Sequence, residues 1–299
     1  MPKSISAGPT QLTASIGLVI GGAMWGVYWI PVRVIADMGL PGVWAGVVLY
    51  LAALIVLLPI IWINRKSLLS KWQTLLFVGF LTGAAFSLFT TSLSMTDVVR
   101  AILLFYLTPV WGTLLGLMVL GERLTITRVL ALVLGLCGLL VVLGLGQKFP
   151  WPQNIGDWLA LSSGIFWAYG SMKLYQMEKI AASEQVLAFL FGSLLVSGFI
   201  LLVGGPELAA KVDINVILNA MPYALLLTIY LLPMFYLTIW PATLLAPGRV
   251  GVLLMSEIVV GVITAAVISG EPFGFREALG TVMIVSAALL EIFGARKTT

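Results

Sequence analysis

Ten continuous apolar runs, each about 20 residues long, dominate this chain of 299 residues. A helix needs about 20 apolar residues to cross the hydrocarbon core of a bilayer, so each run predicts one transmembrane helix. The runs are continuous rather than alternating, which argues against a transmembrane β-barrel. The predicted spans are Leu12–Ile35, Val43–Ile63, Trp72–Leu93, Val98–Leu120, Thr127–Leu145, Ile155–Gln176, Glu184–Gly204, Val216–Leu237, Thr243–Ile268 and Gly274–Phe293.

The composition agrees with an all-α integral membrane protein. Hydrophobic residues make up 61% of the chain and charged residues only 9%, whereas soluble domains carry about 25% charged residues. The sequence has no histidine and a single cysteine, Cys137, which excludes an internal disulfide and metal sites built on His or Cys clusters. We therefore expect no cofactor and no metal. The basic residues are scattered, so a nucleic-acid partner is not expected either.

The distribution of Lys and Arg predicts the orientation in the membrane. The first run is too long for the apolar region of a signal peptide, which is about 7–15 residues, so it is predicted to be the first span. With the N-terminus in the cytoplasm, the inner loops carry Lys3, Arg65, Lys66, Lys71, Arg123, Arg128, Lys179, Arg296 and Lys297, and the outer loops carry Lys148, Lys211 and Arg276. This bias predicts that both termini are cytoplasmic. The protein is expected in the inner, or plasma, membrane.

Two sequence echoes indicate a duplicated chain. Gly121-Glu122 recurs 149 positions later as Gly270-Glu271, and Trp25 recurs 142 positions later as Trp167. The chain divides into residues 1–147 and 148–299, with five predicted spans in each half. Because five is odd, the second half must begin on the opposite side of the membrane. The sequence therefore predicts two inverted five-helix repeats, an arrangement that is typical of transporters with a site between the halves.

The same residues carry a resemblance to a known family. The early tryptophan of each half, Pro109-Val110 in the fourth span and the Gly-Glu turns at Glu122 and Glu271 resemble the drug/metabolite transporter superfamily, EamA-like, with ten helices in two inverted repeats. Within it, the chain is most similar to YddG-type exporters of aromatic amino acids, which implies export of Phe, Tyr and Trp. Many members have proline after the glutamate of span nine. This chain has Ile258 there, which puts a hinge at that position in doubt.

Aromatic residues deep within the spans are the first candidates for a binding site. Trp25 and Trp167 are repeat-related, so a two-fold axis could place them on opposite walls of one cavity. Ring-lined walls suit aromatic solutes and stack cationic groups. The alternative for each residue is ordinary core packing. The candidate substrate-binding residues are Trp25, Tyr106, Trp111, Ser163, Trp167, Tyr230 and Glu257.

Glu257 is the most central charged candidate, because charge inside a membrane is scarce and costly. Its carboxyl group could bind a substrate ammonium or exchange a proton, or it could make a buried structural hydrogen bond. Trp25, Tyr106, Trp167 and Glu257 are expected to face one cavity. Pro109 is expected to kink the fourth span and to free the carbonyl of Phe105, either as a static bend or as a hinge.

These features favour a monomeric transporter that exports small amphipathic solutes, in particular aromatic and other neutral amino acids, by alternating access. No nucleotide-binding motif of the G-x-x-x-x-G-K-[ST] type is present. The energy would therefore come from the solute gradient or from an ion gradient. Alternatives are a multidrug or other metabolite carrier of the same superfamily, a channel or scaffold, and an intramembrane enzyme. An enzyme would need a nucleophile with a base or paired aspartates, for which no motif is found.

Overall fold

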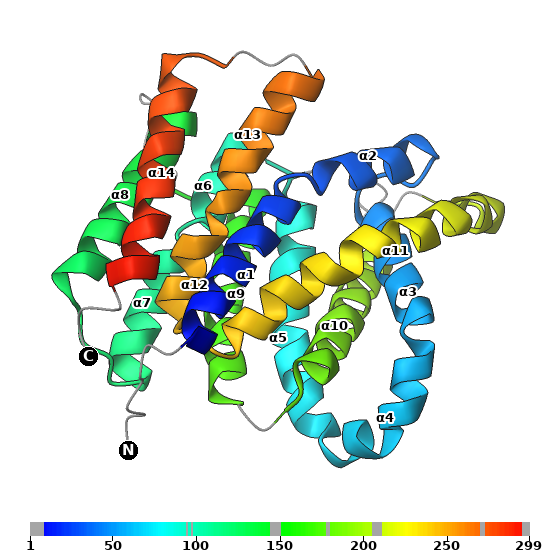
Figure 1. The fold of residues 1–299 in the computed structure, drawn as a ribbon. Helices are drawn as coiled ribbons and strands as arrows, with labels where there is room; N and C mark the ends of the chain where they lie inside the picture. The colour runs from blue at the N-terminus through cyan, green and yellow to red at the C-terminus, as the bar shows by residue number, and fades with distance from the viewer. Residues whose placement is uncertain are drawn as a thin grey trace.

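The computed structural model describes residues 9–93, 95–96, 98–143, 151–177, 180–204, 211–269 and 273–294. These residues form an all-helical bundle (Figure 1). The helices are α1 (Pro9–Trp25), α2 (Trp29–Asp37), α3 (Val43–Val56), α4 (Leu58–Ser70), α5 (Trp72–Ser92), α6 (Val98–Phe105), α7 (Thr108–Val119), α8 (Ile126–Leu143), α9 (Ile155–Gln176), α10 (Ala182–Val203), α11 (Ile214–Ala242), α12 (Pro247–Leu254), α13 (Ser256–Ser269) and α14 (Phe275–Gly294).

Every predicted span contains one helix or two consecutive helices. By length and composition, seven of the described helical segments can cross a membrane, or eight if the bent pair α3–α4 counts as one span. Helices α9 and α14 are not among these segments. A multi-pass membrane architecture therefore holds, whereas the full count of ten spans remains a prediction.

Four of the predicted spans are broken rather than straight. The second span bends by 78° between α3 and α4, where Pro59 in the first turn of α4 cannot donate a backbone hydrogen bond. The fourth span breaks between α6 and α7 ahead of Pro109. As expected, the Phe105 carbonyl leaves the helical pattern, and it accepts a 2.6 Å hydrogen bond from the Thr108 hydroxyl. Proline thus explains these two breaks.

The break in span nine needs no proline. α12 ends at Leu254 and α13 begins at Ser256, so the interruption falls at Met255, 149 positions after Tyr106 in the break of span four. The Ser256 hydroxyl lies 3.0 Å from the carbonyl oxygens of Leu253 and Val19 and donates a hydrogen bond that these two acceptors share. In span nine, the break is thus accompanied by hydrogen bonding of the Ser256 side chain. In span four, the corresponding break is accompanied by a proline.

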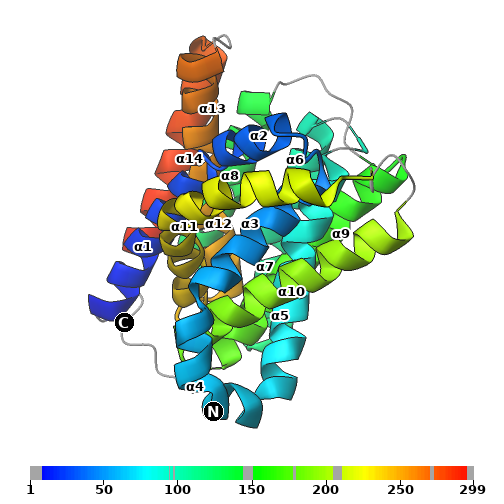
Figure 2. The same ribbon diagram turned by 90° about the vertical axis from the view of Figure 1, so that its right-hand side faces the viewer.

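Neighbouring helices pair across the two sequence halves. α5 packs between α9 and α10, α7 packs on α12, and α1 packs on α11 and α13. The pair α8 and α14 lies at one side of the bundle and α3–α4 at the opposite side (Figure 1). In Figure 2 the α3–α4 side faces the viewer. The beginnings of α1 and α12 and the end of α14 gather at one end, which we name the inner end after the predicted orientation. α2 and the beginnings of α6 and α9 lie at the other, outer end.

Candidate functional site

A cavity of about 470 Å³ opens among α1, α2, α5, α6 and α13. Ligand pockets for small molecules commonly have volumes of about 300–1,000 Å³ and mostly apolar walls with a few polar groups. Seven of the 19 described lining residues are aromatic, namely Trp25, Tyr28, Trp29, Phe86, Phe89, Phe105 and Tyr106. Glu257 and Arg33 are the two charged residues among the described lining residues. The cavity therefore combines flat apolar surfaces with one potential anion and one cation.

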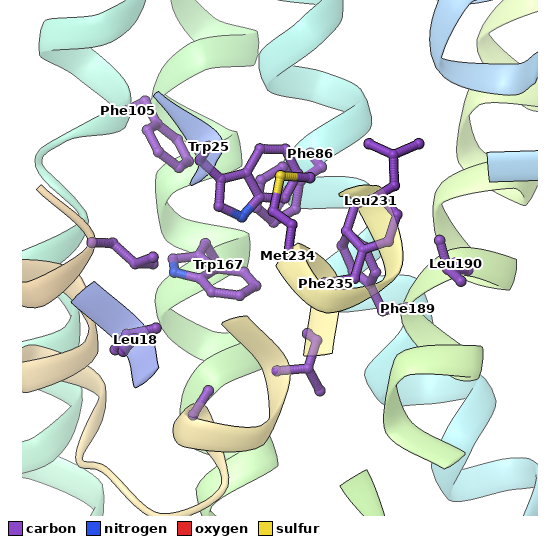
Figure 3. Close-up of a cluster of buried hydrophobic side chains, with 14 of the residues drawn as sticks. Leu18, Trp25, Phe86, Phe105, Trp167, Phe189, Leu190, Leu231, Met234 and Phe235 are labelled. Carbon is purple, nitrogen blue, oxygen red and sulfur yellow. The ribbon is translucent and has the colours of Figure 1, made fainter. Parts of the chain in front are cut away.

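Trp25 forms a rigid part of this wall. Its ring stacks on Phe86 with centroids 4.5 Å apart and planes 16° apart (Figure 3). Its indole N–H donates a 2.8 Å hydrogen bond to the Thr238 hydroxyl. The edge of Tyr28 contacts the same ring at a centroid distance of 4.9 Å. Because the indole is held from three sides, its remaining surface is presented to the cavity in a fixed orientation.

Trp167 lies behind that wall rather than in it. Its side chain is completely buried, and its ring meets Phe86 edge to face at 5.2 Å. Figure 3 shows Trp25 next to Phe86, with Trp167 below the two rings. Trp167 is not a lining residue, so the expectation that both repeat-related tryptophans face one cavity holds for Trp25 and fails for Trp167. Phe86 of α5 contacts both rings, but of these three residues only Trp25 and Phe86 line the cavity.

Tyr106 and Glu257 meet at the cavity from the two broken spans. The Tyr106 hydroxyl donates a 2.6 Å hydrogen bond to Glu257 Oε2. Both residues line the cavity, as expected from the sequence. Glu257 lies in the first turn of α13, directly after the break at Met255. Because Tyr106 uses only one of the carboxyl oxygens, the other oxygen can receive a donor from a bound solute.

Gly26 explains how α1 places Trp25 so near Glu257. A side-chain carbon at position 26 would lie 2.7 Å from the Gly261 backbone nitrogen and would also collide with the Glu257 carbonyl oxygen. Only glycine permits this close approach of the end of α1 to α13. Packing at Gly26 therefore sets how closely the end of α1 approaches α13 beside the cavity.

The other three sequence candidates lie outside the cavity lining. Ser163 is buried in α9, and its hydroxyl donates to the Ala160 carbonyl of its own helix at 2.6 Å. Trp111 of α7 has a buried indole N–H without a partner among the described residues. The Tyr230 hydroxyl donates to the Met24 carbonyl, which holds α11 against α1 beside Trp25. Tyr230 thus supports the part of the cavity wall formed by Trp25 without lining the cavity itself.

Several lining residues are not among those predicted from the sequence. Arg33 of α2 lies over the Trp29 ring, 5.8 Å from its centroid, and both line the cavity. A charge inside a predicted span is itself a signal of a functional site, and Arg33 falls within the first run. Phe86 and Phe89 carry no comparable signal, because phenylalanine is ordinary in an apolar helix. Their role depends on the rotation of α5, which the sequence does not define.

No group of three or more His, Cys, Asp or Glu side chains lies close enough to hold a metal ion within the described part of the chain. The two repeat-related turns cannot be compared, because Glu271 falls outside the described residues. Glu122 in the first turn binds the Arg128 guanidinium at 2.6 Å.

Comparisons with known proteins place this geometry in a family context. Residues 12–144 match the EamA-like transporter family. An uncharacterized transporter from Methanothermobacter thermautotrophicus is 26% identical over 209 residues, which cover 68% of this chain and 59% of that protein. The match thus spans less than two thirds of the relative. The family model thus matches part of the first half of the chain, and the relative is described as a transporter.

The fold itself has a solved counterpart. A crystal structure matches 94% of this chain and 98% of its own chain with a TM-score of 0.70. The two sequences are 18% identical, so this likeness concerns the fold alone.

Proposed function

We propose that this protein is an exporter of aromatic and other neutral amino acids that works by alternating access. Ten spans in two inverted repeats, residues 1–147 and 148–299, would rearrange around the central cavity in the inner membrane, with both termini in the cytoplasm. A single chain would suffice for transport. The observation that carries this proposal is the cavity itself, which has aromatic walls together with one carboxyl and one guanidinium group.

The chemistry of the walls matches the parts of an aromatic amino acid. Aromatic surfaces such as Trp25 and Phe86 favour offset-stacked or edge-to-face contact with a ring. Glu257 is suited to bind the substrate ammonium, and the aromatic faces around it also attract a cation. Arg33 is suited to bind the substrate carboxylate, because a guanidinium presents paired donors that match a carboxylate. Transport would be driven by the substrate gradient or by a proton carried on Glu257.

A second candidate is an exporter of aromatic cations, such as amphipathic drugs. The pairing of Glu257 with aromatic walls favours it, because both attract positive charge. Arg33 separates the two candidates. A guanidinium among the lining residues disfavours a cation that lacks a carboxylate, whereas it helps to bind a zwitterion.

A series of three related solutes tests the proposal in liposomes that hold the purified protein. Phenylalanine carries both charges, phenethylamine only the ammonium and 3-phenylpropionate only the carboxylate. We expect phenylalanine to be transported best. Arg33→Gln should reduce the preference for phenylalanine over phenethylamine, and Glu257→Gln should reduce the preference over 3-phenylpropionate.

Arg65→Gln is the matched control for Arg33. Arg65 also lies over a tryptophan, 4.3 Å from the Trp62 ring, but it is on α4 and does not line the cavity. The control variant should keep the preferences of the unaltered protein. Preferential transport of phenethylamine by the unaltered protein would favour the cation exporter. Absence of flux for all three solutes would refute the proposed substrate class.

A further inference from the structure

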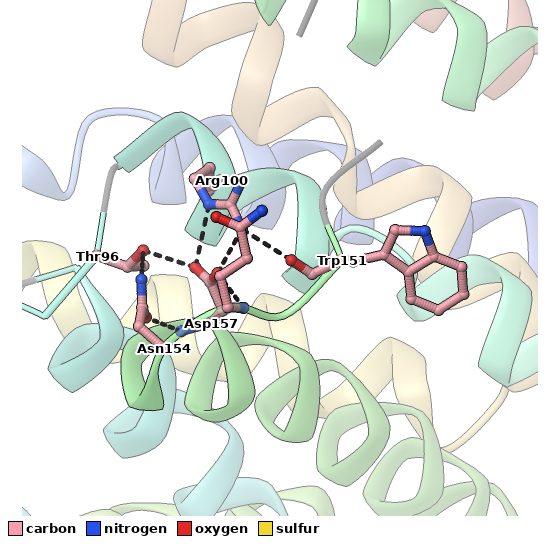
Figure 4. A network of polar contacts seen from close by, with 6 residues as sticks. Thr96, Arg100, Trp151, Asn154 and Asp157 are labelled. Carbon is pink, nitrogen blue, oxygen red and sulfur yellow. Dashed lines mark hydrogen bonds and ion pairs between the residues drawn. The ribbon is translucent and has the colours of Figure 1, made fainter. Parts of the chain in front are cut away.

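A buried ion pair joins the two sequence halves at the outer end. Arg100 of α6 contacts Asp157 of α9 through both carboxyl oxygens, with Nη2 2.5 Å from Oδ2 and Nε 3.4 Å from Oδ1 (Figure 4). The Asp157 carboxylate also accepts hydrogen bonds from the Thr96 hydroxyl at 2.6 Å and the Gln153 backbone N–H at 2.9 Å. The Asp157 side chain is fully buried, whereas the Arg100 side chain is 20% exposed. Arg100 therefore has a complete, built-in carboxylate partner.

A second arginine joins the halves at the inner end, without such a partner. Arg249 of α12 donates from Nη2 to the Ser15 hydroxyl of α1 at 2.9 Å. Only 6% of Arg249 is exposed, and its Nε–H has no hydrogen-bond partner among the described residues. A buried charged donor that is left unpaired is costly, so the incomplete pairing calls for an explanation.

The two contacts are related by the sequence repeat. Arg249 follows Arg100 by 149 positions, which is the offset between the two Gly-Glu turns. Asp157 follows Ser15 by 142 positions, which is the offset between Trp25 and Trp167. α6 packs on α9, and α12 packs correspondingly on α1. The chain thus makes one interhelical contact twice, at opposite ends, but serine replaces the aspartate at the inner end.

The nearby acidic residues do not take the place of that aspartate. Glu122 binds Arg128 at 2.6 Å, and Glu291 lies 3.7 Å from the Nε of the same Arg128. Glu291 also acts electrostatically on Arg249, and so does Arg128 with the opposite sign. No carboxylate of the described residues lies within ion-pair distance of Arg249. The position that Asp157 fills beside Arg100 is therefore taken beside Arg249 by a neutral hydroxyl.

We propose that Arg249 is a loading residue that binds the substrate carboxylate when the transporter faces the cytoplasm. This inference rests on the proposed export of amino acids. Inverted repeats exchange their environments between the two states, so Arg249 should then gain the partial exposure that Arg100 has now. A carboxylate arriving from the cytoplasm can pair with its unpartnered Nε–H. Arg100 is already paired with Asp157, so the corresponding contact at the outer end offers no free guanidinium donor of this kind to a substrate carboxylate.

The test introduces a carboxylate beside Arg249. Ser15→Asp should form an ion pair with Arg249, as Asp157 does with Arg100. Ser15→Asn has the same size as Ser15→Asp but no charge. We expect Ser15→Asp to raise the KM for phenylalanine at the cytoplasmic side by at least about fivefold, measured in vesicles of known orientation. The KM for phenethylamine should not change, and Ser15→Asn should behave like the unaltered protein. Equal effects of Asp and Asn, or no effect of Asp in a protein that transports, would overturn the proposal.

Acetate on the cytoplasmic side distinguishes the substrate carboxylate from an unrelated anion. Competition by acetate that Ser15→Asp removes is expected from a carboxylate site at Arg249. Competition by acetate while Ser15→Asp leaves the KM for phenylalanine unchanged would contradict a loading role.

Thermal unfolding of the purified variants gives a readout that does not need transport. Ser15→Asp should melt above Ser15→Asn, because Arg249 gains an ion-pair partner, and the reciprocal change Asp157→Ser should melt below the unaltered protein. A Ser15→Asp protein that melts below Ser15→Asn would overturn the equivalence of the two contacts. Absence of amino-acid flux in the unaltered protein would instead refute the proposed function. The melting temperatures would then still test whether the two arginine contacts are equivalent.

Discussion

Trp25 and Trp167 occupy corresponding places in the two halves, yet their surroundings differ. Trp25 lines the cavity and donates its N–H to Thr238, whereas Trp167 is fully buried, does not line the cavity and has an N–H that is unpaired among the described residues. The Phe86 ring contacts both, stacked on Trp25 and edge-on to Trp167. The repeat thus provides two corresponding tryptophans, but the helix packing around them leaves only Trp25 in contact with the cavity.

The largest expected effect concerns stability, at Trp167. Trp167→Ala removes a fully buried side chain and should lower the free energy of unfolding by about 3–5 kcal/mol. Trp158→Ala, at a tryptophan that is 57% exposed on the same helix, is the control and should change it by less than about 0.5 kcal/mol. Denaturant unfolding in detergent micelles measures both. Equal losses for the two variants would show that burial does not distinguish them.

Glu257→Gln should have the largest effect on binding. It replaces a charge-assisted hydrogen bond to the substrate ammonium, worth about 1.5–3 kcal/mol, by a neutral one. The KM for phenylalanine should therefore rise by about ten- to one-hundredfold. Unfolding should be little affected, because glutamine can still accept from the Tyr106 hydroxyl. A KM within twofold of the unaltered protein would exclude Glu257 from the site.

Trp25→Ala sharpens the comparison with Trp167. It removes a stacking surface, for which aromatic pairs contribute about 0.5–1.5 kcal/mol beyond area burial. We expect a several-fold rise in the KM for phenylalanine and a smaller rise for alanine, a substrate without a ring. If Trp167→Ala shifted this ratio of KM values as much as Trp25→Ala does, the assignment of separate roles would be wrong.

Tyr106→Phe should have the smallest effect. It removes a single hydrogen bond to Glu257 and keeps the aromatic wall. The net loss of one hydrogen bond is about 0.5–1.5 kcal/mol, so the KM should change by less than about tenfold. Comparing Tyr106→Phe with Glu257→Gln and with the double variant gives their coupling energy. Strictly additive effects would indicate that the two side chains do not act together.

The sequence predicts the positions of the helices well, because apolar length in a membrane chain is a direct physical requirement. It also predicts Trp25, Tyr106 and Glu257 as lining residues, since depth in a span limits where such groups can lie. It does not predict the break at Met255, where no proline marks the interruption.

The rotation of each helix about its own axis is the part that the sequence leaves open. Phe86 looks like any apolar residue of α5, but its ring contacts both repeat-related tryptophans. That position follows from the close packing of α5 against α9 and α10, which no local pattern reveals. For the same reason Trp167 was expected in the cavity wall, whereas the structure buries it.

The most direct test of the central claim is exchange of labelled phenylalanine in liposomes that hold the purified protein, with and without unlabelled phenylalanine inside. The account predicts exchange that is stimulated by internal substrate, nearly lost in Glu257→Gln and retained in Trp158→Ala. Exchange that is equally fast in Glu257→Gln, or the absence of any stimulated exchange in the unaltered protein, would contradict a central amino-acid site.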